Sequence, residues 1–193
     1  MGGGAAALDQ DAQLMLHVKA GDGDSFAILL GKYRATVVRF LYRMVQNQAV
    51  AEELAQETFL RVYRSRNAYE PAAKFTTWLF RIASNLALNW VRDTKEEKGQ
   101  QELDAGPEGV TPQIPAAGPS AEEWLVREAA LDEVRSAIAA LPANQRAAVL
   151  MHKYEEMTYS QIAKALDCSE SAVKSLLFRA YEALRARLAH MER

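Results

Sequence analysis

The sequence contains little of what disulfide scaffolds, metal centres and membrane proteins require. Cys168 is the only cysteine, which excludes an internal disulfide and fits a reducing compartment, so we expect a cytoplasmic protein. The three histidines lie far apart without the spacing of metal ligands, and we expect neither a metal nor a cofactor. No apolar run approaches the ~18 residues that a membrane-spanning helix needs, so we predict no membrane insertion.

Catalytic and targeting motifs are also missing. The sequence has no phosphate-binding loop and no nucleophile paired with a base, so we expect no enzymatic activity. The first residues, MGGGAAALDQ, carry neither the basic region nor the apolar core of a signal peptide. We therefore predict a disordered tail over residues 1–8.

Net charge is small, and its distribution is uneven. The formal net charge is −2, but residues 1–92 carry +3, residues 93–123 carry −6 and residues 124–193 carry +1. An acidic segment therefore separates two mildly basic parts. A protein that binds DNA tightly without help is usually more basic, so we expect any DNA affinity of this chain to depend on a partner.

Proline and glycine are concentrated in residues 99–120, which hold four of the six prolines and four of the ten glycines. A structureless loop of this length is unusual inside a compact domain, so the segment predicts a linker. We place a flexible, acidic linker at residues 95–119. It separates a helical domain at 9–94 from a second small helical domain at 120–193.

The rest of the sequence shows helical periodicity and no β pattern, which predicts an all-α fold. Asp24 and Asn47 each stand where a helix cap is needed, and Ser120 with Glu123 has the spacing of a capping box. The expected helices cover residues 9–20, 24–46, 47–66, 75–94, 120–140, 142–156, 159–166 and 171–187.

The segment from Thr158 to Arg187 has the pattern of a helix-turn-helix. Thr158 and Gln161 form a capping box for its first helix, and residues 167–169 form the turn. At ~100° per residue the second helix has an apolar face and a polar face. The apolar face comprises Val173, Leu176, Leu177, Ala180, Leu184 and Leu188, and the polar face comprises Ser171, Lys174, Ser175, Phe178, Glu182 and Arg185, with Arg179 at its edge. Such a helix is typical of one that enters the DNA major groove, although an ordinary helical hairpin has the same periodicity.

The helix expected at 75–94 has a second unusual face. Its core side comprises Phe75, Leu79, Ile82, Ala83, Leu86 and Trp90, whereas Trp78, Arg81, Asn85, Asn89 and Arg92 form a stripe about 100° away. An aromatic ring, two cations and two amides suit single-strand recognition, in which unstacked bases lie on aromatic rings. The preceding loop, with Tyr69 and Lys74, has residues that could hold an extruded base. The alternative is a helix with a wide polar face and a half-buried Trp78.

The helix expected at 47–66 offers a third surface. Glu52, Glu53, Gln56 and Glu57 lie together near Leu54, Phe59 and Leu60. An acidic surface does not suit DNA, so it indicates either a protein partner or a solvated face.

These segments, in this order, resemble the extracytoplasmic-function group of bacterial sigma factors. AEELAQETFLRVYRS (51–65) and FTTWLFRIASNLALNWVR (75–92) are similar to region two of that family. The segment from ALPANQRAAVLMHKYEEMTYS to AYEALRARL (140–188) is similar to region four, and LHVKAGDGDSFAILLGKY (16–33) matches the part before region two. The resemblance covers nearly all of the chain outside the tail and the linker.

The resemblance implies a subunit that binds core RNA polymerase and directs promoter-specific initiation. By resemblance, the β′ clamp helices would contact Glu53, Leu54, Gln56, Glu57 and Phe59, and the β flap is the other implied contact with polymerase. The melted −10 element would contact Tyr69, Lys74, Trp78, Arg81, Asn85 and Arg92. The −35 element would contact Tyr159, Ser171, Lys174, Ser175, Phe178 and Arg179. The family also implies an anti-sigma factor as a further partner.

Two residues depart from the family pattern. Leu176 stands where the family commonly has arginine, and Asp167 stands where many helix-turn-helix proteins have glycine. Two other functions fit parts of the sequence: a helix-turn-helix regulator that binds DNA without polymerase, and an adaptor or anti-sigma-type module that uses the acidic surface of 47–66. The near-neutral charge and the stripe at Trp78 argue against the first.

Overall fold

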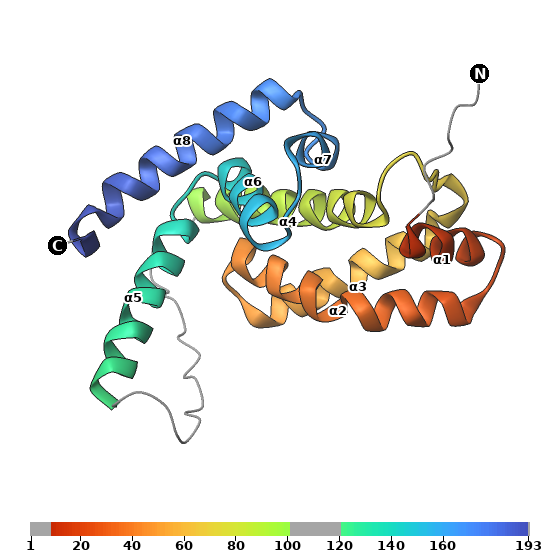
Figure 1. The fold of residues 1–193 in the computed structure, drawn as a ribbon, viewed down its shortest axis with the longest axis horizontal. Coiled ribbons are helices and arrows are strands. Elements are labelled where there is room, and N and C mark those ends of the chain that lie inside the picture. The colour runs from red at the N-terminus through yellow and green to blue at the C-terminus, as the bar shows by residue number, and fades with distance from the viewer. Residues whose placement is uncertain (1–8, 101–120, 193) are drawn as a thin grey trace.

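The computed structural model describes residues 9–100 and 121–192, and all regular elements in these ranges are helical (Figure 1). This confirms the predicted all-α fold. The predicted tail (1–8), Ser120 and the linker residues 101–119 lie outside the described residues. The elements are α1 (Gln10–Lys19), α2 (Gly23–Val45), α3 (Gln48–Arg64), η1 (Arg66–Ala68), α4 (Phe75–Gln100), α5 (Ala121–Ala139), α6 (Ala143–Tyr154), α7 (Tyr159–Ala165), α8 (Glu170–Leu188) and η2 (Ala189–Glu192).

Short polar side chains cap most of these helices, as the sequence predicts, with one correction. The carboxylate of Asp22, and not that of Asp24, caps α2 by accepting the backbone N–H of Asp24 at 3.0 Å. Asp22 also accepts the Ser25 hydroxyl at 2.7 Å, and this bond is the main cause that lowers the pKa of Asp22. The expected helix start at Asp24 is therefore wrong, because Asp22 has the extended backbone that a cap needs and Asp24 is already helical.

Helix α4 is longer than the sequence analysis predicts. It continues to Gln100, whereas the prediction ends it at Thr94 and begins the linker at Lys95. The segment DTKEEK (93–98) contains neither glycine nor proline and includes good helix formers, so nothing in it stops the helix. Helix α3 ends earlier than expected, at Arg64, and the 3-10 turn η1 follows it.

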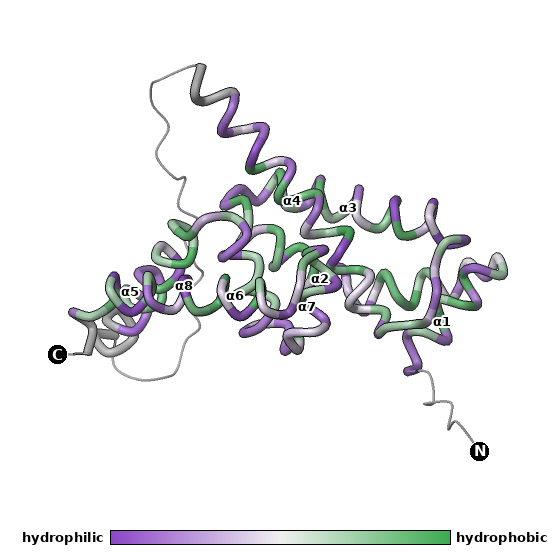
Figure 2. The backbone as a smooth tube through the Cα atoms, turned by 90° about the horizontal axis from the view of Figure 1, so that it is seen from above, coloured by the Kyte–Doolittle hydropathy of each residue, from purple (hydrophilic) through white to green (hydrophobic). Residues whose placement is uncertain are grey.

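The helices form two halves, an N-terminal half (α1–α4) and a C-terminal half (α5–α8). In the first, α2 packs against α1, α3 and α4; in the second, α8 packs against α5, α6 and α7. The halves also pack against each other, because α4 contacts α6 and α7 while α2 contacts α5 and α6 (Figure 1). Buried residues from both halves, among them Phe80 and Ile162, belong to one continuous apolar core. Figure 2 shows hydrophobic and hydrophilic positions alternating along the helices, as amphipathic packing requires.

Three specific contacts join the two halves. Arg146 of α6 donates to the carbonyl of Met44 at the end of α2, and also to the carbonyls of Ala139 and Leu141 in its own half. The Arg43 guanidinium lies 4.0 Å from the ring centroid of Tyr154. The third contact is between α4 and α7, where the buried Ser84 hydroxyl lies 3.5 Å from the Ala165 carbonyl.

Candidate nucleic-acid and polymerase interfaces

The helix-turn-helix is built by local interactions that the sequence predicts. The Thr158 hydroxyl accepts the Gln161 N–H at 3.3 Å while the Gln161 amide oxygen accepts the Thr158 N–H at 2.8 Å, which confirms the capping box. Asp167 has φ 52° in the turn, a left-handed conformation that aspartate tolerates better than most residues. Ser169 then caps α8 through the Ala172 N–H at 3.1 Å. This turn fixes the direction in which α8 leaves α7.

The apolar side of α8 is buried, and its polar side faces solvent. Val173, Leu177 and Ala180 are buried in the core, and Leu176 is half-buried against it, so its predicted place on the apolar face is confirmed. The residues predicted to face the −35 element are all exposed; they are Tyr159, Ser171, Lys174, Ser175, Phe178 and Arg179.

Within this exposed surface, charge and aromatic area are both available to a ligand. Phe178 is 68% exposed, the highest value among the large hydrophobic residues that the structure describes. Neither Lys174 nor Arg179 forms an ion pair with any described residue. An exposed ring with two unpaired cations can contact thymine methyl groups and phosphates together.

The stripe on α4 is also in the predicted arrangement. Arg81, Asn85, Asn89 and Arg92 are exposed, and Trp78 is half-buried at the start of the stripe. Arg81 forms no ion pair with a described residue, whereas Arg92 pairs with the adjacent Asp93 at 3.1 Å. Because Trp78 keeps part of its ring accessible, it offers a stacking surface beside a free cation.

Tyr69 differs from its predicted position in the −10 site. Its side chain is 1% exposed, and its ring lies 5.1 Å from Trp78 and 6.4 Å from Phe75 between centroids. Burial raises the pKa of Tyr69 to about 12, and its hydroxyl has no hydrogen-bond partner among the described residues. In this conformation Tyr69 supports Trp78 from the core side and does not face a bound strand, while Lys74 is exposed.

The predicted polymerase-binding residues lie along α3. Glu53 and Gln56 are exposed, Leu54 is half-buried, and Glu57 pairs with Arg61 at 2.7 Å. Phe59 is 5% exposed, so it contributes the wall of a groove and not a protruding contact.

This groove lies between α2 and α3, and the sequence alone does not predict it. It has a volume of about 630 Å³ and is lined from α2 by Phe26, Leu30 and Arg34 and from α3 by Gln56, Phe59, Leu60 and Tyr63, among others. Leu60 is 48% exposed and Tyr63 is 40% exposed. These two large apolar residues on the outer face of α3 indicate a binding surface in the sequence. They do not reveal the groove, because its second wall is α2.

The described residues contain no group of three or more potential metal ligands. Within residues 9–100 and 121–192, no helix combines the length and hydrophobicity of a membrane span.

Comparison with known proteins agrees with this geometry. The family model described as "Sigma-70 region 2" matches residues 29–97, and the model described as "Sigma-70, region 4" matches residues 131–184. The ECF RNA polymerase sigma factor SigW of Bacillus subtilis (strain 168) is 34% identical over 173 residues, which cover 89% of this chain and 92% of SigW. The RNA polymerase sigma factor CarQ of Myxococcus xanthus is 35% identical over 179 residues, which cover 92% of this chain and 97% of CarQ.

A solved structure shares the fold as well. The sigma factor RpoE of Bartonella quintana, in complex with the anti-sigma factor NepR, superimposes with a TM-score of 0.67 at 20% identity, covering 85% of this chain and 96% of that one. The two family models fall on the two halves of the fold, one containing α4 and the other containing α8. This chain therefore belongs to the extracytoplasmic-function sigma factors, which direct promoter-specific transcription.

Proposed function

We propose that this sigma factor recognises its promoter through two separate surfaces, the polar face of α8 and the stripe of α4. The observation that carries the proposal is that each surface combines an accessible aromatic ring with a cation that has no ion-pair partner among the described residues. These are Phe178 with Lys174 and Arg179 on α8, and Trp78 with Arg81 on α4.

On α8, the proposed ligand is the duplex −35 element. A recognition helix inserts its N-terminal part into the major groove, and Ser171, Lys174, Ser175 and Phe178 lie in the first half of α8. We assign contacts with the flanking phosphates to Arg179 and to the exposed Tyr159 at the start of α7. Since Leu176 packs against the core, we expect no base contact at the position where the family commonly has arginine.

On α4, the proposed ligand is the melted non-template strand of the −10 element. Unstacking a base costs a few kcal/mol, and stacking it on an aromatic side chain returns roughly 1–3 kcal/mol. Trp78 supplies the ring, the buried Tyr69 and Phe75 hold that ring in place, and Arg81, Asn85, Arg92 and Lys74 supply polar contacts. The strand is captured as it opens, so this chain performs no covalent chemistry.

The groove between α2 and α3 is the proposed docking site for core RNA polymerase, through the β′ clamp helices. Its apolar lining and the exposed Leu60 and Tyr63 support this, because burying such residues drives association. Glu53, Leu54, Gln56 and Glu57 form the neighbouring rim. We assign contact with the β flap to the C-terminal half, and we place the protein in the cytoplasm, where polymerase works.

An anti-sigma factor is a further proposed partner. The structure of the Bartonella quintana sigma factor contains its anti-sigma factor NepR. A protein that covers the α2–α3 groove would compete directly with polymerase, which is a sufficient mechanism of inhibition.

Both promoter elements cannot be bound while the two halves stay packed. The −10 and −35 elements are named for their positions on the promoter. Their centres therefore lie about 25 base pairs apart, or ~85 Å along straight B-DNA. In the packed chain, Trp78 lies ~9 Å along α4 from Ser84, which contacts Ala165. From Ala165 the chain can reach at most ~18 Å to Glu170, and α8 adds ~12 Å to Phe178. The two surfaces are thus less than ~50 Å apart, so promoter binding requires the halves to separate.

Run-off transcription with core RNA polymerase tests the proposal. Templates drawn from the genome of origin should yield discrete transcripts only when this protein is added. A gel shift without polymerase serves as the second arm. Tight, sequence-specific binding by the protein alone, with no effect on transcription start, would support a polymerase-independent regulator instead.

A further inference from the structure

The N-terminal helix α1 lies before the region-two match, which begins at residue 29, and neither surface described above includes it. It nevertheless packs against α2, η1 and α4, the elements that surround the segment from Tyr69 to Lys74. Contacts at both ends of α1 connect it to that segment and to its neighbours.

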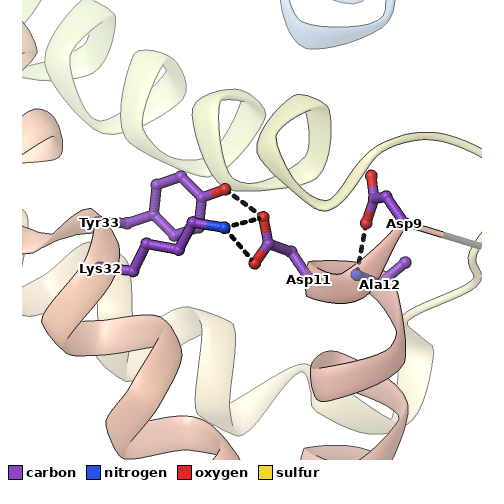
Figure 3. Close-up of polar contacts among 5 residues, drawn as sticks. All are labelled: Asp9, Asp11, Ala12, Lys32 and Tyr33. Carbon is purple, nitrogen blue, oxygen red and sulfur yellow. Dashed lines mark hydrogen bonds and ion pairs between the residues drawn. The ribbon is translucent and has the colours of Figure 1, made fainter.

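One end of α1 is fixed to α2 by a half-buried carboxylate. Asp11 accepts the Tyr33 hydroxyl at 2.5 Å and the Lys32 ammonium at 2.6 Å, and Asp9 caps the helix through the Ala12 N–H at 2.6 Å (Figure 3). The Asp11 side chain is 13% exposed, so this ion pair is better shielded from water than most surface pairs. Burial and the bond to Asp11 both raise the pKa of Tyr33, which keeps its hydroxyl protonated and donating.

The other end of α1 holds the segment that precedes α4. Lys19, the last residue of α1, donates its ammonium to the Tyr69 carbonyl at 2.9 Å, across 50 positions of sequence. The Tyr69 ring packs on Trp78, so the backbone that Lys19 holds is the backbone that sets the ring beneath Trp78. The Asp11 end reaches the same cluster, because the Tyr33 ring lies 5.5 Å from Phe75.

We infer that α1 acts as a bracket: it holds the Tyr69–Trp78 ring pair, and the segment from Tyr69 to Lys74, in the conformation that would bind the melted strand. Lys19 is a positioning residue for this site. This inference rests on the proposed function of the α4 stripe. Lys19 itself touches no DNA in this arrangement; it fixes the Tyr69 backbone and thereby the ring pair Tyr69–Trp78. Asp11 serves the same purpose from the other end by anchoring α1 to α2.

The physical reason is preorganisation. The segment from Tyr69 to Lys74 connects η1 to α4 without regular structure, so its conformations must be restricted before a base can stack reproducibly. A hydrogen bond from a charged donor restricts such a segment strongly; its loss typically changes an equilibrium by about tenfold. Lys19→Met removes the donor at similar side-chain length, whereas Lys19→Arg keeps a cationic donor.

Two measurements on the full-length protein test the bracket. Hydrogen exchange of the free protein should show about tenfold faster exchange at residues 69–77 in Lys19→Met, with other helices unchanged. In holoenzyme, the lifetime of the open complex should fall by about tenfold while affinity for core polymerase stays within twofold of wild type. Lys19→Arg should recover most of both effects, and His17→Met, an exposed control on the same helix, should match wild type.

Asp11→Ala adds a test of the mechanism. If both ends act through α1, Asp11→Ala should reproduce the phenotype of Lys19→Met. The double variant should then be less impaired than the product of the two single effects, because either change already releases the bracket.

Several results would overturn the inference. Wild-type exchange at residues 69–77 in Lys19→Met would show that the bond does not order the segment. Equal loss in Lys19→Arg and Lys19→Met, or a parallel loss of polymerase affinity and thermal stability, would assign Lys19 a general structural role. If wild-type protein supports no promoter-specific transcription, the proposed function fails, while the exchange measurement still decides whether α1 orders the segment.

Discussion

The packing of the two halves, combined with the proposed function, predicts that the halves separate when the protein binds a promoter. Ser84 is fully buried at the contact between α4 and α7, with its hydroxyl 3.5 Å from the Ala165 carbonyl. Ser84→Arg places a large cation there; overpacking costs ~1–3 kcal/mol, and an unpaired buried charge adds several more. Separation of the halves relieves both costs, since the arginine then reaches water. We expect Ser84→Arg to shift the free protein from the packed to the separated state.

The size of the effect follows from the dimensions of the two states. A packed chain of this length has a radius of gyration of about 16 Å, and each half alone has about 12 Å. If the centres of two such halves lie ~50 Å apart, the whole chain has a radius of gyration of about 28 Å, because the separation of the centres adds to the size of each half. Small-angle X-ray scattering distinguishes these values easily. Polymerase should bind Ser84→Arg at least as well as wild type, because Ser84 is not among the residues that line the α2–α3 groove.

Matched controls separate opening from unfolding. Ser136 is exposed on α5, so Ser136→Arg should leave the radius of gyration unchanged. Circular dichroism should show that Ser84→Arg keeps its helices. Tyr154→Ala, which removes the stack with Arg43 and leaves the α4–α7 contact in place, should open the halves more weakly. A Ser84→Arg protein that keeps its helices and its packed radius, or a promoter complex in which the α4–α7 contact persists, would refute the reasoning.

Four further changes test single surfaces. Trp78→Ala should shorten the open-complex lifetime by roughly five- to 150-fold, as expected from ~1–3 kcal/mol of stacking, while polymerase binding in a pull-down is retained. Phe178→Ala should reduce −35 duplex affinity in holoenzyme, and replacing −35 thymines by uracil should weaken wild type more than the variant if the ring contacts methyl groups. Leu60→Glu should weaken polymerase binding in a fluorescence titration at least tenfold, whereas the exposed Glu52→Gln should not. Tyr69→Phe should leave the melting temperature unchanged or raise it, since the buried hydroxyl it removes has no partner among the described residues; a loss of more than ~1 kcal/mol would contradict that account.

The helix-turn-helix could be predicted from sequence because its determinants are local. The Thr158–Gln161 capping box and the tolerance of Asp167 for a left-handed turn depend on residues within a few positions of one another. The apolar periodicity of α8 likewise identifies Val173 and Leu177 as core. The same logic correctly orients the stripe on α4, from Trp78 to Arg92.

The sequence predictions are wrong where two neighbouring residues or two local structures are equally favoured, and where a residue packs against side chains that are distant in sequence. Asp22 and Asp24 have the same side chain, and only the backbone conformation at Asp22 decides which of them caps α2. The sequence prediction ends α4 at Thr94 because a charged segment suits a linker, but the same charged residues also favour a helix, which continues to Gln100. The burial of Tyr69 depends on packing against Phe75 and Trp78, which a loop sequence does not reveal.

Hydrophobic periodicity within one helix cannot predict contacts between elements that are far apart in sequence. The α2–α3 groove needs both walls, and each helix alone shows only an amphipathic pattern with a few exposed apolar residues such as Leu60. The bond from Arg146 to the Met44 carbonyl spans 102 positions, and no local rule predicts it. The sequence therefore predicts two domains correctly in outline but not that they pack together.

The charge of the chain supports the proposal that two small surfaces act together on the promoter. Each proposed DNA-contacting surface offers few cations without an ion-pair partner among the described residues, Lys174 and Arg179 on α8 and Arg81 on α4, in a protein of net charge −2. Affinity from phosphate contacts grows with the number of charges neutralised, so neither surface alone holds DNA firmly at physiological salt. On the proposed function, polymerase binding through the α2–α3 groove would supply the missing affinity by raising the local concentration of both surfaces at the promoter. If the free chain stays packed and its two surfaces act jointly only after the halves separate, as we propose, the chain would not occupy promoters without polymerase.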